Sequence, residues 1–139
     1  MPALDQCEPQ VVRALEKAGW RVTNQPFAIR IDKTRASYIY ADLRLTKTKT
    51  QETAIVVEVK CFADSRNWLD EFYRAVGQYV AYRIALALNG IAVPIYLAVP
   101  FPVYIEFFPK PLIESMMQDV YMNLIVINLE TEEIVLWIP

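Results

Sequence analysis

Three side chains of the sequence could together act on a phosphodiester: Asp42, Glu58 and Lys60. Glu58 and Lys60 lie in the stretch AIVVEVKCF, residues 54–62, which otherwise has the apolar character of a buried strand. Side chains alternate across a strand, so both point to the same face, roughly 7 Å apart. An anion and a cation are costly to bury unless they are paired or bind a ligand. This strand end is therefore a candidate site.

The cofactor that this pattern predicts is Mg²⁺ (or Mn²⁺). If the segment Ser37–Leu45 pairs with the strand of Glu58, Asp42 approaches Glu58, and two carboxylates repel each other unless a cation joins them. Mg²⁺ prefers oxygen ligands and keeps positions for water and phosphate, so Asp42 and Glu58 are the predicted metal ligands. Lys60 is predicted to orient a water or to neutralise charge in the transition state. The alternative is a strand that ends in Glu and Lys because it emerges into solvent.

Two residues of a predicted long helix are further candidates. Gln78 and Tyr82 lie four positions apart and therefore share a face of that helix. Gln78 could hydrogen-bond a site carboxylate or a DNA phosphate, which would make it a supporting catalytic residue, and Tyr82 is a predicted DNA contact. The alternative is that Tyr79 and Tyr82 pack in the core and that Gln78 is exposed.

Charged residues elsewhere give weaker signals. Glu8, on the first predicted helix, either reaches the cation as a further metal ligand or is a surface charge. Residues 30–49 carry a net charge of +4, which either contacts DNA or forms a solvated loop face. The predicted nucleic-acid contacts in this segment are Arg44, Lys47 and Lys49.

The spacing of apolar residues, interrupted by Gly and Pro, predicts the elements that position these residues. A first helix ends at Gly19, and the extended segments after it are predicted to form an antiparallel meander. A long helix then connects the strand of Glu58 to a second buried strand, which a right-handed crossover makes parallel to the first. The predicted segments are the helix Pro9–Ala18, the strands Trp20–Thr23, Phe27–Ile31, Ser37–Leu45 and 54–62, a long helix ending near Gly90, the strand Ile91–Val99, short helices within Phe101–Pro111 and Leu112–Val120, and a hairpin of Leu124–Asn128 with Ile134–Ile138.

Composition limits the class of protein. The 139 residues fit one domain spanning 1–139, and the proportions of 55% apolar and 22% charged residues indicate a folded chain with a partner interface or a homo-oligomer. Histidine is absent, which excludes His-dependent triads, His-ligated zinc and a His base. The net charge of −2 gives no global field for a polyanion. Two cysteines, Cys7 and Cys61, without a signal peptide or a membrane-spanning stretch, predict a reduced cytoplasmic setting and no disulfide.

Eight blocks of the sequence, taken in order, resemble a known family. They are MPALD, ALEKAGW, YADL, VVEVKCF, AVGQYVAYR, YLAVP, EFF and EEIVLWIP. In this order they resemble the XisH family, the fdxN element excision controlling factor proteins of cyanobacteria, over essentially the whole chain.

This resemblance implies a fold and a site. The implied fold is α/β with a restriction-endonuclease-like, PD-(D/E)XK core, in which a mixed central sheet is flanked by helices. The acidic residues and the lysine of that signature map to Asp42, Glu58 and Lys60, and Gln78 with Tyr82 resembles a Gln-x-x-x-Tyr motif of such nucleases. Glu8 stands where the family tends to have a histidine, and a carboxylate can replace histidine as a metal ligand.

The resemblance also implies a biological role and partners. The family is implicated in the excision of a DNA element during heterocyst development, together with a small protein called XisI and a site-specific recombinase. Two hypotheses follow. The first is a Mg²⁺-dependent, nuclease-like domain that acts on DNA phosphodiesters. The second is a non-catalytic excision-controlling subunit that uses the same fold to dock a XisI-like protein partner.

Overall fold

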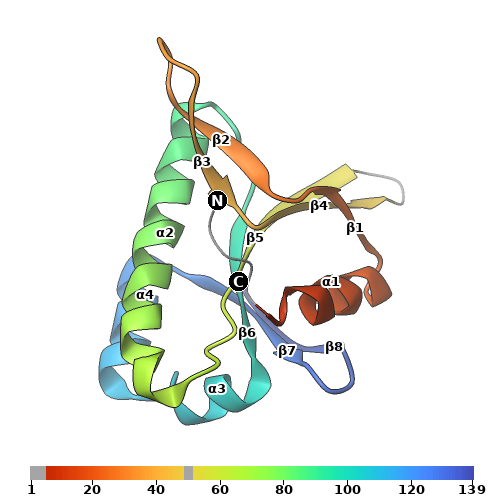
Figure 1. Cartoon of the computed structure of the whole chain (residues 1–139), viewed down its shortest axis with the longest axis vertical. Coiled ribbons are helices and arrows are strands. Elements are labelled where there is room, and N and C mark those ends of the chain that lie inside the picture. The colour runs from red at the N-terminus through yellow and green to blue at the C-terminus, as the bar shows by residue number, and fades with distance from the viewer. Residues whose placement is uncertain (1–5, 49–51) are drawn as a thin grey trace.

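The computed structural model describes residues 6–48 and 52–139. These residues form four α-helices and eight strands (Figure 1). The elements are α1 (Glu8–Lys17), β1 (Trp20–Asn24), β2 (Phe27–Asp32), β3 (Ser37–Ala41), β4 (Leu43–Thr48), β5 (Glu52–Val59), the 3₁₀ turn Ser65–Asn67, α2 (Trp68–Leu88), β6 (Ile95–Pro100), α3 (Phe101–Glu106), α4 (Pro111–Val120), β7 (Asn123–Asn128) and β8 (Glu133–Ile138).

A mixed six-stranded sheet, in the order β1-β4-β5-β6-β7-β8, organises the chain. The strands β5, β6 and β7 run parallel, and the remaining neighbours are antiparallel. The long helix α2 connects β5 to β6, so the predicted parallel crossover is confirmed. The expected hairpin near the end of the sequence is also confirmed, as β7 paired with β8.

The sheet separates two apolar cores, and Figure 1 shows α1 and α2 on its opposite sides. One core packs Phe72, Tyr79 and Leu86 of α2 against the face of the sheet that carries Val56. The other packs Val11 and Leu15 of α1 against the opposite face. Alternation along β5 therefore sends odd and even positions into different cores. Glu58, at an even position, belongs to the α2 side.

The predicted antiparallel meander is wrong in its pairing. β1 pairs with β4, and β2 with β3 forms a separate two-stranded sheet, here called the β2–β3 ribbon. The reason is that the apolar side chains of these segments belong to different cores. Val22 of β1 packs on the α1 side, whereas Ile29 of β2 and Ile39 of β3 pack on the α2 side.

The expected single strand Ser37–Leu45 is also interrupted, because Asp42 separates β3 from β4. Residues before it pair within the ribbon, and residues after it pair with β5. The predicted pairing of this segment with the strand of Glu58 holds for β4, where Leu43 lies opposite Val57. Asp42 therefore occupies the point at which the chain changes sheets.

The expectation of two unpaired cysteines is wrong. Cys7 and Cys61 form a buried disulfide, with their Cα atoms 5.8 Å apart. The packing of α1 against the sheet brings its first turn to the end of β5, within the Cα separation that a disulfide requires. Within residues 6–48 and 52–139, no helix is long and apolar enough to cross a membrane.

Candidate functional site

Asp42 and Glu58 are held together by reciprocal hydrogen bonds to the backbone. The Asp42 amide donates to Glu58 Oε1 at 3.2 Å, and Asp42 Oδ2 accepts from the Val59 amide at 2.7 Å. Asp42 can make these bonds because the chain leaves the ladder at this residue. The two carboxylates predicted from the sequence are therefore neighbours, and each is anchored to the other's strand.

Lys60 completes this group of charges. Its Nζ lies 3.6 Å from Glu58 Oε2, and its amide donates to the Ala98 carbonyl at 3.0 Å, which extends the parallel pairing with β6. The residue is 8% exposed and Glu58 only 3%. A separation of 3.6 Å exceeds that of a charge-assisted hydrogen bond, so the two groups form an ion pair without a close contact. The strand end is thus buried, and it does not emerge into solvent.

The electrostatics of the site favour the uptake of positive charge. The pKa of Glu58 is raised from 4.5 to about 8, first by burial and next by the negative charge of Asp42. Lys60 and the Asp42 amide act in the opposite direction without cancelling the rise. Two carboxylates beside one ammonium group leave a net negative charge, so a proton or a metal cation stabilises the cluster.

The helix α2 supplies one wall of the site. Tyr82 is buried, and its hydroxyl donates to the Tyr40 carbonyl at 2.8 Å. The pKa of Tyr82 is raised, mainly by burial and then by the charges of Glu58 and Asp42, so the phenol stays protonated near them. Little of Tyr82 is therefore at the surface, and Tyr82 as a DNA contact stays a prediction. In the structure its hydroxyl fixes the strand that leads to Asp42.

Gln78 lies one helical turn before Tyr82 and is partly buried. Its Oε1 is inaccessible to solvent and accepts no hydrogen bond from the residues that the structure describes. Of the two expectations for this face of α2, the tyrosines are in the core, as the second proposed, but Gln78 is not fully exposed. A role for Gln78 beside the carboxylates remains a prediction.

The chain turns sharply just after Lys60. Phe62 has φ +49°, a left-handed conformation that is costly for an aromatic residue. The turn is held by Glu71 Oε1, which accepts from the Phe62 amide at 3.2 Å, and by Trp68 Nε1, which donates to the Phe62 carbonyl at 2.8 Å. The beginning of α2 thereby fixes the end of β5, and so the position of Lys60.

Glu8 is not the surface charge that one expectation described. It is 1% exposed, and its Oε2 accepts from Gln25 Nε2 at 2.7 Å. The disulfide of the preceding residue, Cys7, ties this first turn of α1 to Cys61. No group of three or more acidic, cysteine or histidine side chains suited to a metal occurs among the described residues. Glu8 as a metal ligand therefore stays a prediction.

The predicted nucleic-acid contacts on β4 are dispersed. Arg44 donates to Thr23 Oγ1 at 2.9 Å. Lys47 lies opposite Thr53 of β5, toward the end of the strand away from Glu58, with its Nζ 5.5 Å from the centre of the Trp20 ring. Lys49 lies outside the described residues. The structure does not bring Lys47 to the carboxylates.

Sequence reasoning missed several residues that support the site. Gln25, Glu71 and the disulfide act through contacts between segments that are 17, 9 and 54 positions apart, which the periodicity of a helix or strand does not encode. One signal was present: each cysteine stands beside a candidate site residue, Cys7 before Glu8 and Cys61 after Lys60. A pair of cysteines placed in this way indicates two segments that meet in space.

Fold and site together define an α/β protein in which a mixed sheet carries a buried carboxylate pair and a lysine where a strand leaves the sheet. The sequence matches the XisH protein family over residues 1–135. The chain belongs to the XisH family.

Two crystal structures support this assignment. An XisH family protein from Nostoc punctiforme PCC 73102 is 31% identical, with 96% of this chain and all of that chain covered and a TM-score of 0.84. An fdxN element excision controlling factor protein from Anabaena variabilis is 29% identical, with 97% of this chain and all of that chain covered and a TM-score of 0.84. No curated protein matches the chain.

Proposed function

We propose that the chain is a DNA-rearrangement factor that acts on DNA phosphodiesters with a divalent cation at the Asp42–Glu58 pair. The observation that carries this proposal is the contact between two carboxylates in a buried site with one lysine. A purely structural ion pair needs one acid and one base. The second acid adds repulsion, which is costly for the folded chain unless a proton or a cation neutralises it, and a divalent cation would take the place of the proton that Glu58 holds below its raised pKa.

The donor set suits Mg²⁺ or Mn²⁺. Carboxylate oxygens are the ligands that these ions prefer, and Mg²⁺ commonly uses only one or two of them. Asp42 and Glu58 would hold the ion, with Glu8 as a further candidate. When bound, such an ion polarises a phosphodiester and lowers the pKa of a water molecule. Lys60 would stabilise negative charge that develops on the phosphate, and Gln78 would orient groups beside the carboxylates.

The family supports the biological setting of this proposal. The relative from Anabaena variabilis is described as an fdxN element excision controlling factor protein. By this likeness, the substrate of the chain would be the DNA of an excised element. The mixed sheet, with Asp42 and with Glu58 and Lys60 two positions apart, agrees with a restriction-endonuclease-like, PD-(D/E)XK core, which we propose as the finer description of the fold.

Calorimetric titration with Mg²⁺ and Mn²⁺ tests the metal site. Wild-type protein should bind one of these ions, and Glu58→Ala and Asp42→Asn should each abolish the heat. Asp119→Asn, a change at an exposed carboxylate on α4, is the matched control and should bind as wild type does. Heat indistinguishable from buffer for the wild type would contradict the proposed site.

Nicking of supercoiled DNA then tests catalysis. Wild-type protein with Mg²⁺ or Mn²⁺ should convert supercoiled DNA to the relaxed form, and Lys60→Ala should lose this activity while it retains metal binding. Equal nicking by Lys60→Ala and wild type would show that the activity belongs to a contaminant or to another site. The assay should be repeated with the XisI-like protein and the site-specific recombinase, the partners that the family implies.

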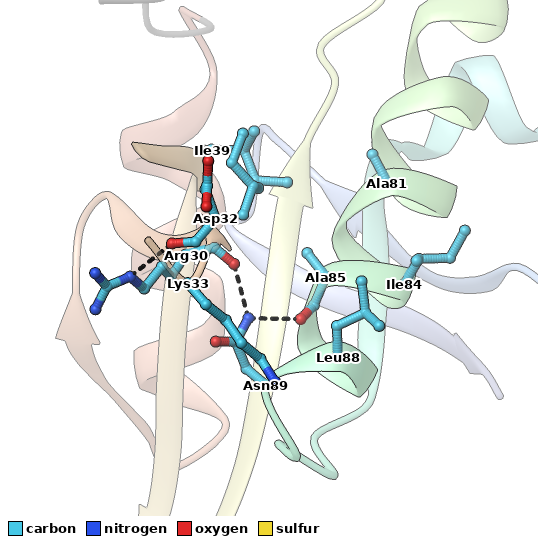
Figure 2. Close-up of a pocket in the computed structure, with 10 residues that line it drawn as sticks. Arg30, Asp32, Lys33, Ile39, Ala81, Ile84, Ala85, Leu88 and Asn89 are labelled. Atoms are coloured by element: carbon cyan, nitrogen blue, oxygen red, sulfur yellow. Dashed lines mark hydrogen bonds between the residues drawn. The ribbon is translucent and has the colours of Figure 1, made fainter. Parts of the chain in front are cut away.

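A second candidate function is favoured by an apolar groove. The groove, of about 390 Å³, lies between β2 and the last turns of α2 (Figure 2), and Ile31, Ile84 and Leu88 are exposed there. On this hypothesis the chain is a non-catalytic excision-controlling subunit that docks a XisI-like protein in the groove. Leu88→Glu should abolish a complex between the purified proteins. Leu112→Glu, at an exposed leucine on α4, should preserve it.

A further inference from the structure

The β2–β3 ribbon has one face that no other described element covers. Its inner face places Ile29 and Ile39 in the core against α2. Its outer face consists of alternate residues, and the register sets Arg30 opposite Tyr38 and Ala28 opposite Tyr40. All four of these outer residues are exposed. Figure 1 shows the ribbon extending away from the six-stranded sheet, with its turn projecting from the molecule.

Two aromatic rings are displayed on this outer face. Tyr38 is 41% exposed and Tyr40 is 46% exposed. They lie two residues apart on the same face of β3, and thus about 7 Å apart along the strand. The small side chain of Ala28 opposite Tyr40 covers little of that ring. The face therefore offers two flat apolar surfaces in a row.

The charge around these rings is positive. Arg30 lies beside Tyr38, and Arg35 lies in the turn, whereas Lys33 of the same turn lines the groove between β2 and α2. Asp32 is the one acid in residues 27–41, and its carboxylate accepts hydrogen bonds from the amide and the hydroxyl of Thr34, at 2.9 and 2.8 Å. Figure 2 shows the Arg30 guanidinium directed away from the apolar groove, with its Nε donating to the Asp32 carbonyl at 2.9 Å.

The ribbon is fixed relative to the carboxylate site. Asn89 Nδ2, at the end of α2, donates to the Arg30 carbonyl at 2.7 Å and to the Ala85 carbonyl at 2.7 Å (Figure 2). At the other end of the ribbon, the Tyr40 carbonyl accepts from Tyr82, and Asp42 follows two residues later. A strand bound along the ribbon would therefore be led toward Asp42 and Glu58.

We propose that the outer face of the ribbon binds single-stranded DNA, with bases stacked on Tyr38 and Tyr40 and phosphates paired with Arg30 and Arg35. The choice of DNA rests on the proposed function. The choice of a single strand follows from the rings, because only unpaired, unstacked bases expose faces that can stack on a side chain. The ribbon thereby defines the substrate as DNA with an unpaired segment near the scissile bond.

Fluorescence anisotropy with labelled oligodeoxythymidylate, in EDTA, tests the proposal without the metal site. Tyr38→Ala and Tyr40→Ala should each weaken binding about tenfold or more, whereas Tyr38→Phe and Tyr40→Phe should bind nearly as wild type does. Tyr73→Ala, at a tyrosine of α2 that is 47% exposed, is the matched control and should change nothing. Arg35→Ala should make the salt dependence shallower by about 0.7 in log–log slope.

Three results would overturn the proposal: unchanged binding by both alanine variants, tighter binding of duplex DNA than of the single strand, or tighter binding of oligouridylate. Circular dichroism and thermal melting establish that each variant is folded. Failure of the proposed function has a different readout. Glu58→Ala should lose metal binding and nicking while it still binds the oligonucleotide in EDTA, so the ribbon and the carboxylate site are tested separately.

Discussion

The backbone amide of Asp42 donates a hydrogen bond to the carboxylate of Glu58, while the Asp42 carboxylate accepts from the amide that follows Glu58. In the middle of a strand, the amide of a residue normally bonds to the backbone of a neighbouring strand. Asp42 lies between β3 and β4, which belong to different sheets, so its amide can bond to the Glu58 carboxylate. The break in the strand and the pairing of the carboxylates are therefore one structural feature.

Asp42→Ala should destabilise the fold, because it removes the acceptor for the Val59 amide at the edge of a buried site. The expected loss in the free energy of unfolding is about 1–3 kcal/mol, the usual cost of leaving a buried polar group unsatisfied. Asp42→Asn keeps an oxygen at this position and removes the repulsion with Glu58, so its stability should stay close to that of wild type. Urea denaturation of both variants, without metal, measures the difference. Equal losses for the two would contradict the role of the acceptor.

The stability of the metal-free protein should depend on the titration of Glu58. Its pKa is about 8 in the folded chain and 4.5 in the reference state. Between these values the folded state holds a proton that the unfolded state lacks, so the free energy of unfolding decreases as pH rises from about 4.5 to about 8. Glu58→Gln should flatten this part of the profile. Thermal melts in EDTA across this range measure it, and identical slopes for both proteins would refute the assignment.

Reduction of the Cys7–Cys61 disulfide should lower stability. The two residues are 54 positions apart, and loop-closure entropy for that length corresponds to about 4 kcal/mol. Chemical denaturation with and without dithiothreitol measures the loss. A Cys7→Ala/Cys61→Ala double variant should be insensitive to the reductant, which separates the effect of the bond from other effects of the reagent. A wild-type midpoint that does not move would mean that the bond contributes nothing.

Tyr82→Phe should destabilise the protein modestly. The change removes the hydroxyl that donates to the Tyr40 carbonyl and leaves the buried ring in place. The expected loss is about 1 kcal/mol. Tyr73→Phe, at an exposed tyrosine of the same helix, is the control and should be neutral. A loss of the same size in both variants would point to helix propensity and not to this hydrogen bond.

Much of the fold could be predicted because its signals are local. The apolar spacing of α2, the left-handed Gly19 after α1 and the alternation along β5 each depend on a few neighbouring residues. The pairing of Asp42 with Glu58 also followed, since β4 and β5 are neighbours in the sequence and pair in antiparallel fashion. Contacts between two strands that are adjacent in the sequence and form a hairpin can be predicted in this way.

The features that could not be predicted, which are the pairing of the β2–β3 ribbon and the burial of Glu8, depend on which of the two cores each segment joins. The β2–β3 ribbon crosses to the α2 side, and nothing in its alternation distinguishes that core from the other. Burial of Glu8 and its hydrogen bond with Gln25 likewise follow from the docking of α1 on the sheet. A glutamate at the beginning of an amphipathic helix is usually solvated, so sequence alone favoured the wrong environment.

The rings of Trp20 and Trp137 lie 5.9 Å apart, so the first and last strands of the six-stranded sheet touch although almost the whole sequence separates them. During synthesis on the ribosome, β1 leaves the exit tunnel long before β8 exists. Trp20 can pack against Trp137 only after β8 has been synthesised. A nascent chain stalled before residue 133 would therefore leave this aromatic contact unformed and its surface exposed.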